Sequence, residues 1–120
     1  TGNAIRVPTP NVSLAVLVLN LKEEVTKDVL NDFLKNSAFS SKYRQIIGYT
    51  NSPEAVSTDF YSSPFATIVD SQATIAEGNQ VTLYCWYDNE FGYSKQVLNL
   101  TKKVAKIELP RFPKAIDPSV

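Results

Sequence analysis

The sequence predicts an α+β fold, in which a mostly antiparallel sheet is covered by helices. Three observations predict it. An apolar run at residues 12–21 and an alternating run at residues 80–87 each have the composition and period of a strand. Two further segments, 26–36 and 91–105, carry the spacing and end signals of helices. Between the first helix and residue 80, short apolar runs separated by turn residues predict additional strands.

Residues 12–21 give the strongest strand signal in the chain. Leu14, Val16 and Val18 fall on one face, and the opposite face carries Ala15, Leu17, Leu19 and Leu21. Apolar residues on both faces predict a strand that is covered on both sides. A buried helix is the alternative, but the β-branched residues and the preceding prolines favour a strand. Residues 4–7 predict a short extended segment, and Pro8 and Pro10 mark a kink or an edge after it.

The segment 26–36 predicts a helix that covers the sheet. Thr26 is suited to the N-cap position, and Asp28 lies in the first turn, where the helix dipole favours an acidic group. An apolar face follows at helical spacing, formed by Val29, Leu30, Phe33 and Leu34.

Several short elements are expected after residue 44. Strands are predicted at 45–50, 56–60, 66–69 and 73–76, with a turn at Asp70 and Ser71 and a hairpin loop at 77–79. The second helix has Lys102 and Lys103 in its last turns. We therefore expect one domain over residues 1–106, including this helix, and a proline-rich extended tail over 107–120, held by Ile107, Leu109 and Phe112.

Composition limits the classes of function. The 120 residues carry twelve basic and twelve acidic side chains, so there is no basic surface for nucleic acid. No apolar run approaches the roughly 20 residues of a membrane span, and the first residues do not form a secretory signal. The single cysteine, Cys85, fits a reducing compartment and a cytoplasmic location. Because the chain does not begin with Met and opens on the approach to a strand, we expect it to be an excised part of a larger protein.

The absence of histidine is the most informative negative feature. A Ser-His or Cys-His nucleophile pair cannot be assembled from this chain, and neither can a histidine metal site. Any reaction in which the chain takes part must therefore use catalytic side chains from other polypeptide segments.

Two segments carry a specific resemblance. TGNAIRVPTPNVS at residues 1–13 and WYDNEFGYS at residues 86–94 closely resemble the phosphorylating glyceraldehyde-3-phosphate dehydrogenase family. Shorter matches lie between them in the same order, namely IIGYT, VSTDF and IVD. The resemblance extends from residue 1 to about residue 105. Asn3, the segment YSSPFAT and the tail depart from the usual pattern and would suit a divergent, longer branch of the family.

The resemblance implies a larger parent enzyme. Its expected parts are an N-terminal dinucleotide-binding domain and a catalytic domain with a nucleophilic cysteine and a later histidine. Of these, the chain would supply the later part of the catalytic domain and the terminal helix, which packs against the cofactor domain. The parent is expected to be a homotetramer of glycolysis or gluconeogenesis that oxidises glyceraldehyde 3-phosphate to an acyl phosphate, using inorganic phosphate and NAD or NADP.

Three residues are predicted to contribute to a site. By resemblance, Arg6 binds the substrate phosphate, and its guanidinium offers a planar fork of donors suited to phosphate oxygens. The alternative is an arginine paired with a surface carboxylate. By resemblance, Asn89 holds the nicotinamide carboxamide, because an amide offers both a donor and an acceptor to another amide. Its alternative role is an N-cap of the second helix. Tyr93 is predicted beside the nicotinamide, with core packing as its alternative.

Two tempting assignments are rejected. Cys85 lies within a predicted strand with no histidine to generate a thiolate, so we expect a buried structural residue and not the nucleophile. Asp88 and Glu90 provide too few ligands for a metal, so a charged entry to the helix is expected. The chain itself is therefore expected to contain no catalytic residue and no metal site.

The sequence leaves two other functions open. The parent could be an erythrose-4-phosphate dehydrogenase, although such relatives often have Cys at the position of Tyr87. The chain could also be a standalone, non-catalytic assembly or binding domain of the same fold. An upstream sequence that continues into a nucleophile motif and a dinucleotide-binding motif would exclude this last possibility.

Overall fold

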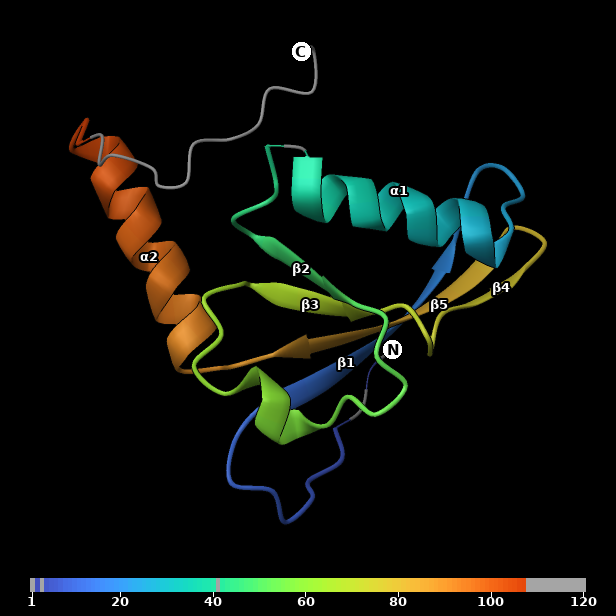
Figure 1. Ribbon diagram of the computed structural model, residues 1–120, viewed down its shortest axis with the longest axis horizontal. Coiled ribbons are helices and arrows are strands. Elements are labelled where there is room, and N and C mark those ends of the chain that lie inside the picture. Colours follow the sequence, from blue (N-terminus) through green and yellow to red (C-terminus); the bar gives the residue numbers. More distant parts are fainter. Residues whose placement is uncertain (1, 3, 41, 108–120) are drawn as a thin grey trace.

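The computed structural model describes residues 2, 4–40 and 42–107. Within them the chain forms a five-stranded sheet, two α-helices and one short 3₁₀ helix (Figure 1). In chain order the elements are β1 (Ser13–Asn20), α1 (Lys27–Ser40), β2 (Ile47–Thr50), η1 (Ser57–Phe60), β3 (Thr67–Asp70), β4 (Ile75–Glu77), β5 (Gln80–Tyr87) and α2 (Phe91–Val104). The predicted α+β class is confirmed. Neither α-helix is long and apolar enough to cross a membrane.

The sheet is mostly antiparallel, as predicted. Its strands lie in the order β1-β5-β3-β2, and β4 also pairs with β5. β5 is antiparallel to each of its partners, whereas β2 and β3 are parallel. β1 pairs with β5 along its whole length, from Ser13 opposite Tyr87 to Asn20 opposite Gln80. The predicted hairpin is also present: Gly78, with a φ of 58°, occupies the turn between Glu77 and Gln80.

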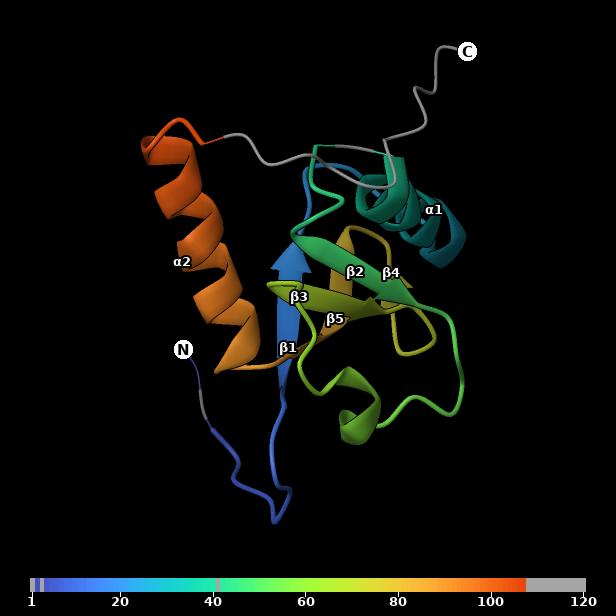
Figure 2. The ribbon, with the colours of Figure 1, turned by 60° about the vertical axis from the view of Figure 1, so that its left-hand side comes forward.

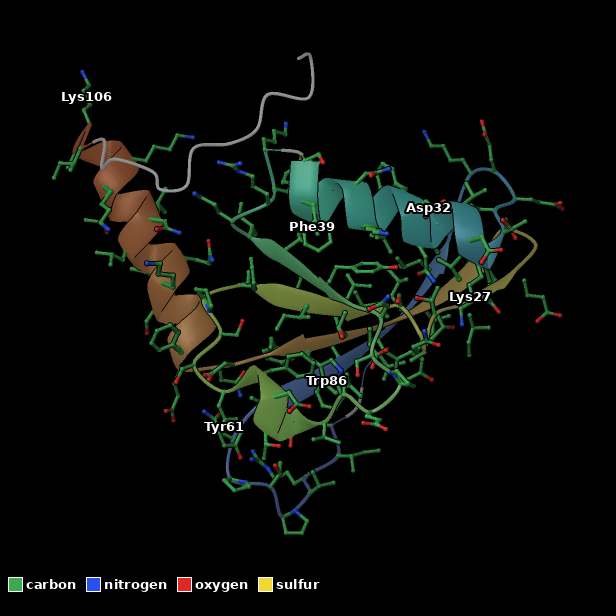
Figure 3. The ribbon with its side chains drawn as sticks, in the orientation of Figure 1. Lys27, Asp32, Phe39, Tyr61, Trp86 and Lys106 are labelled. Carbon is green, nitrogen blue, oxygen red and sulfur yellow. The ribbon has the colours of Figure 1, made fainter. Side chains whose placement is uncertain are left out.

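Alternation along β5 divides the core between the two faces of the sheet. Leu83 and Cys85 form one buried cluster with Val69, and Leu30 and Leu34 of α1 pack against it. On the other face, Phe60 of η1 is buried with Val12 and Ile68, and its ring stacks on that of Trp86 with a centroid distance of 5.4 Å. Figure 3 labels Trp86 beside η1. The sheet is thus covered by α1 on one side and by η1 on the other.

The predicted strand at 56–60 is wrong, because η1 occupies that position. The carboxylate of Asp59 accepts a hydrogen bond from the backbone N–H of Val56 at 2.9 Å. Short polar side chains that bind the local backbone compete with strand pairing, and the sequence VSTDF supplies such a side chain at the necessary spacing. Its β-branched residues had favoured the strand.

The predicted first helix is present and extends to Ser40, four residues beyond its expected end. Thr26 occupies the predicted N-cap, where its hydroxyl accepts from the Val29 N–H at 3.4 Å. Only part of the predicted apolar face contacts the sheet, since Leu30 and Leu34 pack inward whereas Val29 and Phe33 are 61% and 66% exposed. The additional turn buries Ala38.

The prediction that β1 is covered on both faces is wrong for the residues described. β1 is the end strand of the sheet, and α1 packs over the opposite edge, at β2. Leu14, Val16 and Val18 are 40–62% exposed on one face, and Leu17 and Leu19 are 42% and 40% exposed on the other. Apolar composition identified the strand but not the layer above it.

α2 rises from the end of β5 and stands beside the sheet rather than across it (Figure 2). Its first turns are anchored, because Gly92 is buried against the backbone of Phe65 and Gln96 donates to the Pro64 carbonyl at 3.0 Å. Further along, Leu100 and Val104 are 63% and 76% exposed. Of the predicted tail contacts, Ile107 is 54% exposed, and Leu109 and Phe112 lie outside the described residues.

Candidate functional site

The two most distinctive sequence segments meet through residues 11–13 and 87–89 at one end of the sheet. The pairing of β1 with β5 places Ser13 opposite Tyr87. Two side-chain hydrogen bonds continue the junction beyond the strands: Asn11 to Asp88 at 3.3 Å, and Asn89 to Ser13 at 3.1 Å. Residues more than 70 positions apart thereby form one local structure.

Asp88 lies at the centre of this junction and is only 3% exposed. Its Oδ1 accepts from the backbone N–H groups of Phe91 at 2.8 Å and Glu90 at 3.0 Å. Its Oδ2 accepts from the Ser62 N–H at 3.0 Å and from Asn11 Nδ2 at 3.3 Å. Hydrogen bonds to the charged form, the one from Phe91 first among them, hold the pKa of this carboxyl below its ordinary value despite its burial.

Asp88 therefore caps α2, and it does so in place of Asn89. A carboxylate that accepts from the first free N–H groups of a helix satisfies donors that have no partner within the helix. The proposed N-cap role of Asn89 is wrong, because its side chain contacts Ser13 and not the helix. The charged entry to the helix that the sequence predicts at Asp88 and Glu90 is confirmed, but Asp88 was not singled out as the cap. An Asp just before the first helical residues is itself an N-cap signal and could have identified it.

Asn11 and Val12 form the other half of the junction. Val12 has a φ of 72°, an unfavourable backbone conformation for a β-branched residue, and it is 6% exposed. Asn11 Oδ1 accepts from the Val12 N–H at 2.8 Å while its Nδ2 donates to Asp88. Burial and these two hydrogen bonds hold the chain in a sharp bend directly before β1.

Asn89 is exposed, and its amide retains hydrogen-bonding capacity. One Nδ2 hydrogen is directed at Ser13 Oγ. The second hydrogen and Oδ1 have no hydrogen bond to the part of the chain that the structure describes. A donor and an acceptor on one planar group are what a carboxamide ligand requires.

Arg6 lies in the extended segment before the bend and is exposed. It makes no hydrogen bond or ion pair with residues 2, 4–40 or 42–107, so the alternative of a surface salt bridge finds no partner there. Thr9 ties the same segment to η1, with its hydroxyl 3.3 Å from that of Ser57. The guanidinium is thus carried by a segment that is attached on both sides of the bend.

Tyr93 and Cys85 occupy contrasting positions. Tyr93 is 72% exposed on α2, so it does not pack in a core formed by the described residues. α2 begins at Phe91, so Asn89 lies in the turn directly before the helix, two residues from its first residue. Cys85 is buried as predicted, and burial raises the pKa of its thiol, which lowers the thiolate population that a nucleophile needs.

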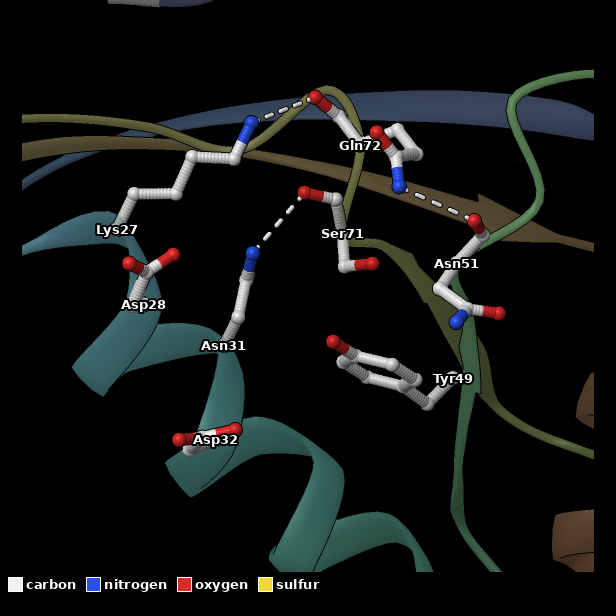
Figure 4. Close-up of a pocket in the computed structure, with 8 residues that line it drawn as sticks. All are labelled: Lys27, Asp28, Asn31, Asp32, Tyr49, Asn51, Ser71 and Gln72. Atoms are coloured by element: carbon white, nitrogen blue, oxygen red, sulfur yellow. Dashed lines mark hydrogen bonds between the residues drawn. The ribbon is translucent and has the colours of Figure 1, made fainter.

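A separate polar hollow lies between α1 and the turn after β3 (Figure 4). It has a volume of about 430 Å³ and is lined by Lys27, Asp28, Asn31, Asp32, Tyr49, Asn51, Ser71 and Gln72. Lys27 donates to the Gln72 carbonyl at 2.8 Å and Asn31 to the Ser71 carbonyl at 3.0 Å. These bonds attach the helix to the turn. Within the described residues, no three His, Cys, Asp or Glu side chains are placed to hold a metal ion.

Comparison with known proteins finds one family over most of the chain. The family model described as "Glyceraldehyde 3-phosphate dehydrogenase, C-terminal domain" matches residues 1–89. A "Glyceraldehyde-3-phosphate dehydrogenase-like protein" of Pseudomonas aeruginosa is 50% identical over 114 residues, which are 95% of this chain and 25% of that protein. "Glyceraldehyde-3-phosphate dehydrogenase 2" of Bacillus subtilis is 42% identical over 105 residues, 87% of this chain and 30% of that protein. The chain thus spans about a quarter to a third of the length of these relatives.

Proposed function

The chain belongs to the glyceraldehyde-3-phosphate dehydrogenase family. We propose that it is part of a larger phosphorylating dehydrogenase that oxidises phosphorylated aldehydes. In this reaction the aldehyde is oxidised to an acyl phosphate, with inorganic phosphate as the second substrate and NAD or NADP as the hydride acceptor. The observation that carries the proposal is the junction of residues 11–13 with 87–89, which attaches the segment that follows Arg6 to the turn that carries Asn89.

Arg6 is proposed to bind the phosphate of the aldehyde. It is exposed and unpaired within the described residues, so its donors are available to a ligand. A guanidinium binds phosphate through parallel, charge-assisted hydrogen bonds that fix orientation as well as supply affinity.

Asn89 is proposed to orient the nicotinamide. The bond to Ser13 fixes the amide at the end of β1, and the remaining donor and acceptor can pair with the carboxamide of the cofactor. Tyr93, exposed on the first turns of α2, is proposed to lie beside the same ring.

The groups that break and form covalent bonds are proposed to lie outside this chain. The chain contains no histidine, and its one cysteine is buried with a raised pKa. We therefore expect the 120-residue chain alone to reduce neither NAD nor NADP in the presence of glyceraldehyde 3-phosphate. Turnover that survives Cys85→Ser would contradict this assignment.

The exposed apolar surfaces support assembly with further polypeptide. Leu100 and Val104 on α2, and Val16 and Val18 on β1, are all more than half exposed. We propose that the cofactor domain of the parent covers α2 and that other subunits of a cytoplasmic homotetramer contribute to covering the sheet. The match to the Pseudomonas protein includes at least eight of residues 107–120, which supports a longer branch of the family with a tail of its own.

The test of the proposed function is Arg6→Ala in the full-length enzyme. Loss of charge-assisted hydrogen bonds worth about 1.5–3 kcal/mol should lower kcat/KM for the phosphorylated aldehyde about 10- to 150-fold. The loss should be small for the unphosphorylated analogue. Lys22→Ala removes an exposed cation beyond the opposite end of β1 and should leave both values unchanged. Equal losses for the two aldehydes in Arg6→Ala would mean that Arg6 is structural and would remove the phosphate site from this chain.

A further inference from the structure

The carboxylate of Asp88 joins three parts of the chain that are remote in sequence. Its four hydrogen bonds reach the bend before β1, the residue Ser62 after η1, and the first turn of α2. Each oxygen accepts two of them, and the side chain is 3% exposed. A carboxylate with both oxygens so occupied has one orientation, and the groups that donate to it share that orientation.

These hydrogen bonds have consequences on both sides of the junction. On one side, Asn89 lies between Asp88 and the two backbone N–H groups that Asp88 binds, so these bonds fix the backbone from which the Asn89 side chain extends. On the other side, the bond from Asn11 holds the bend that leads back to Arg6. That bend includes Val12 at a φ of 72°, a strained conformation that persists only where its surroundings fix it.

We propose that Asp88 is a positioning residue that holds the substrate segment of Arg6 and the cofactor residue Asn89 in one fixed geometry. This inference rests on the proposed function, because it assigns to Asp88 an effect on two residues whose roles are themselves proposed. Asp88 contacts neither substrate nor cofactor in this account. Its contribution is the alignment of the two binding groups, and misplacement of such groups by about 1 Å can cost on the order of 100-fold in rate.

Asn11→Asp in the full-length enzyme is the more selective of two test variants. The introduced carboxylate keeps an oxygen that can accept from the Val12 N–H, but it places a second oxygen where Nδ2 now donates to Asp88. The tie to the bend is then lost, whereas the cap of α2 by Asp88 Oδ1 is retained. The second variant, Asp88→Asn, removes the charge and sets an NH₂ group against the donors around it.

Both variants should lower kcat/KM, per active site, for the phosphorylated aldehyde and for the cofactor together, by roughly 10- to 100-fold. Combining Asn11→Asp with Asp88→Asn reverses donor and acceptor across the bond between these two positions, while the Ser62 N–H then faces an NH₂ group. The combination should recover at most about tenfold of the loss in Asn11→Asp, since a hydrogen bond of about 1.5 kcal/mol corresponds to that factor. Melting temperature and oligomeric state are measured beside the kinetics. The matched control is Asp28→Asn, which removes a carboxylate from the first turn of α1 and should change neither kinetic constant.

The outcomes separate this inference from the proposed function. A normal kcat/KM per active site in Asn11→Asp and Asp88→Asn, with Arg6→Ala and Asn89→Asp still impaired, would overturn the positioning role alone. A lower melting temperature with normal kinetics would do the same, because it would show a purely structural carboxylate. Absence of an effect in Arg6→Ala and Asn89→Asp would refute the proposed function and the positioning role with it.

Discussion

The two α-helices of this chain have the same length, 14 residues, and are attached in opposite ways. α1 lies across the sheet and is held by its face, through Leu30, Leu34 and the buried Ala38. α2 is held by its beginning, through the cap of Asp88 and the buried Gly92, while Leu100 and Val104 remain exposed. An amphipathic sequence therefore specifies a helix, whereas the contacts at its start or on its face decide where the helix is fixed.

The N-terminal caps also differ between the two helices, and the cap of α2 makes more and shorter hydrogen bonds than the cap of α1. Thr26 provides α1 with one long hydrogen bond of 3.4 Å, and the packed face provides the rest of its attachment. Asp88 provides α2 with two shorter bonds and joins it to two other segments. A helix without a packed face depends on its first turn, and in this chain that first turn is also part of the candidate site.

The largest effect is expected from Gly92→Ala, which tests the attachment of α2. An added Cβ would lie 2.6 Å from the backbone carbonyl oxygen of Phe65, and backbone cannot move aside as the end of a side chain can. The helix must shift, and we expect the free energy of unfolding of the intact protein to fall by about 1–3 kcal/mol. Chemical denaturation measures this, with Gly2→Ala as the control, because nothing lies within 4 Å of the corresponding Cβ. Similar unfolding curves for the two variants would show that the close approach at Gly92 is unimportant.

A smaller effect is expected from Leu34→Ala, which tests the attachment of α1. Leu34 is half-buried against the cluster of Val69, Leu83 and Cys85, so we expect a loss of about 1–2 kcal/mol, below the range for full burial. Phe33→Ala, on the adjacent but 66% exposed position, should change stability by about 0.5 kcal/mol or less. A greater loss for Phe33 than for Leu34 would mean that α1 is held by its outer face in the intact protein.

Sequence reasoning found the elements because their signals are local. The alternation of residues 80–87 gave β5 with the bounds that the structure shows, and Gly78 marked its hairpin. The segment 56–60 misled because its β-branched residues favour a strand, whereas Asp59 binds the backbone of Val56. The burial of β1 could not be predicted, since it depends on what lies over an end strand and not on the strand itself.

In the candidate site, too, local features could be predicted from the sequence and contacts between distant residues could not. The resemblance selected Arg6 and Asn89 from short local motifs, and their roles stay predictions. The link from Asn11 to Asp88 joins residues 77 positions apart, and no local pattern encodes such a contact. The N-cap was considered as the alternative role of Asn89. Asn and Asp are both suited to that position, and the choice between neighbours depends on where the backbone turns.

The pH dependence of stability offers a finer test of the junction at Asp88. Its pKa is lower in the folded protein than the ordinary value of 3.8, chiefly because the Phe91 N–H binds the charged form. Folding is therefore favoured by this group above the unfolded-state pKa, and the contribution is lost as the pH falls through the folded-state value. We expect the stability difference between the wild type and Asp88→Asn to be greatest near neutral pH and to narrow in acid. Urea unfolding from about pH 6 to pH 3 measures it, and a difference that widens in acid would contradict the assignment.

The smallest effect on stability is expected from Asn89→Ala. If Asn89 were the cap of α2, its loss would cost about 1 kcal/mol. The structure gives that role to Asp88 and leaves Asn89 with one exposed bond to Ser13, so the melting temperature should stay close to that of the wild type. Ser13→Ala removes the other partner of the same bond and should be equally mild. Under the proposed function, however, Asn89→Ala should raise KM for the cofactor, because the amide that pairs with the carboxamide is gone. Asn89→Asp should impair cofactor use as well, since a carboxylate cannot donate to the carboxamide oxygen. The full-length variants should therefore keep the melting temperature of the wild type while their cofactor kinetics are impaired. A variant with a lower melting temperature and normal cofactor kinetics would show that Asn89 is purely structural.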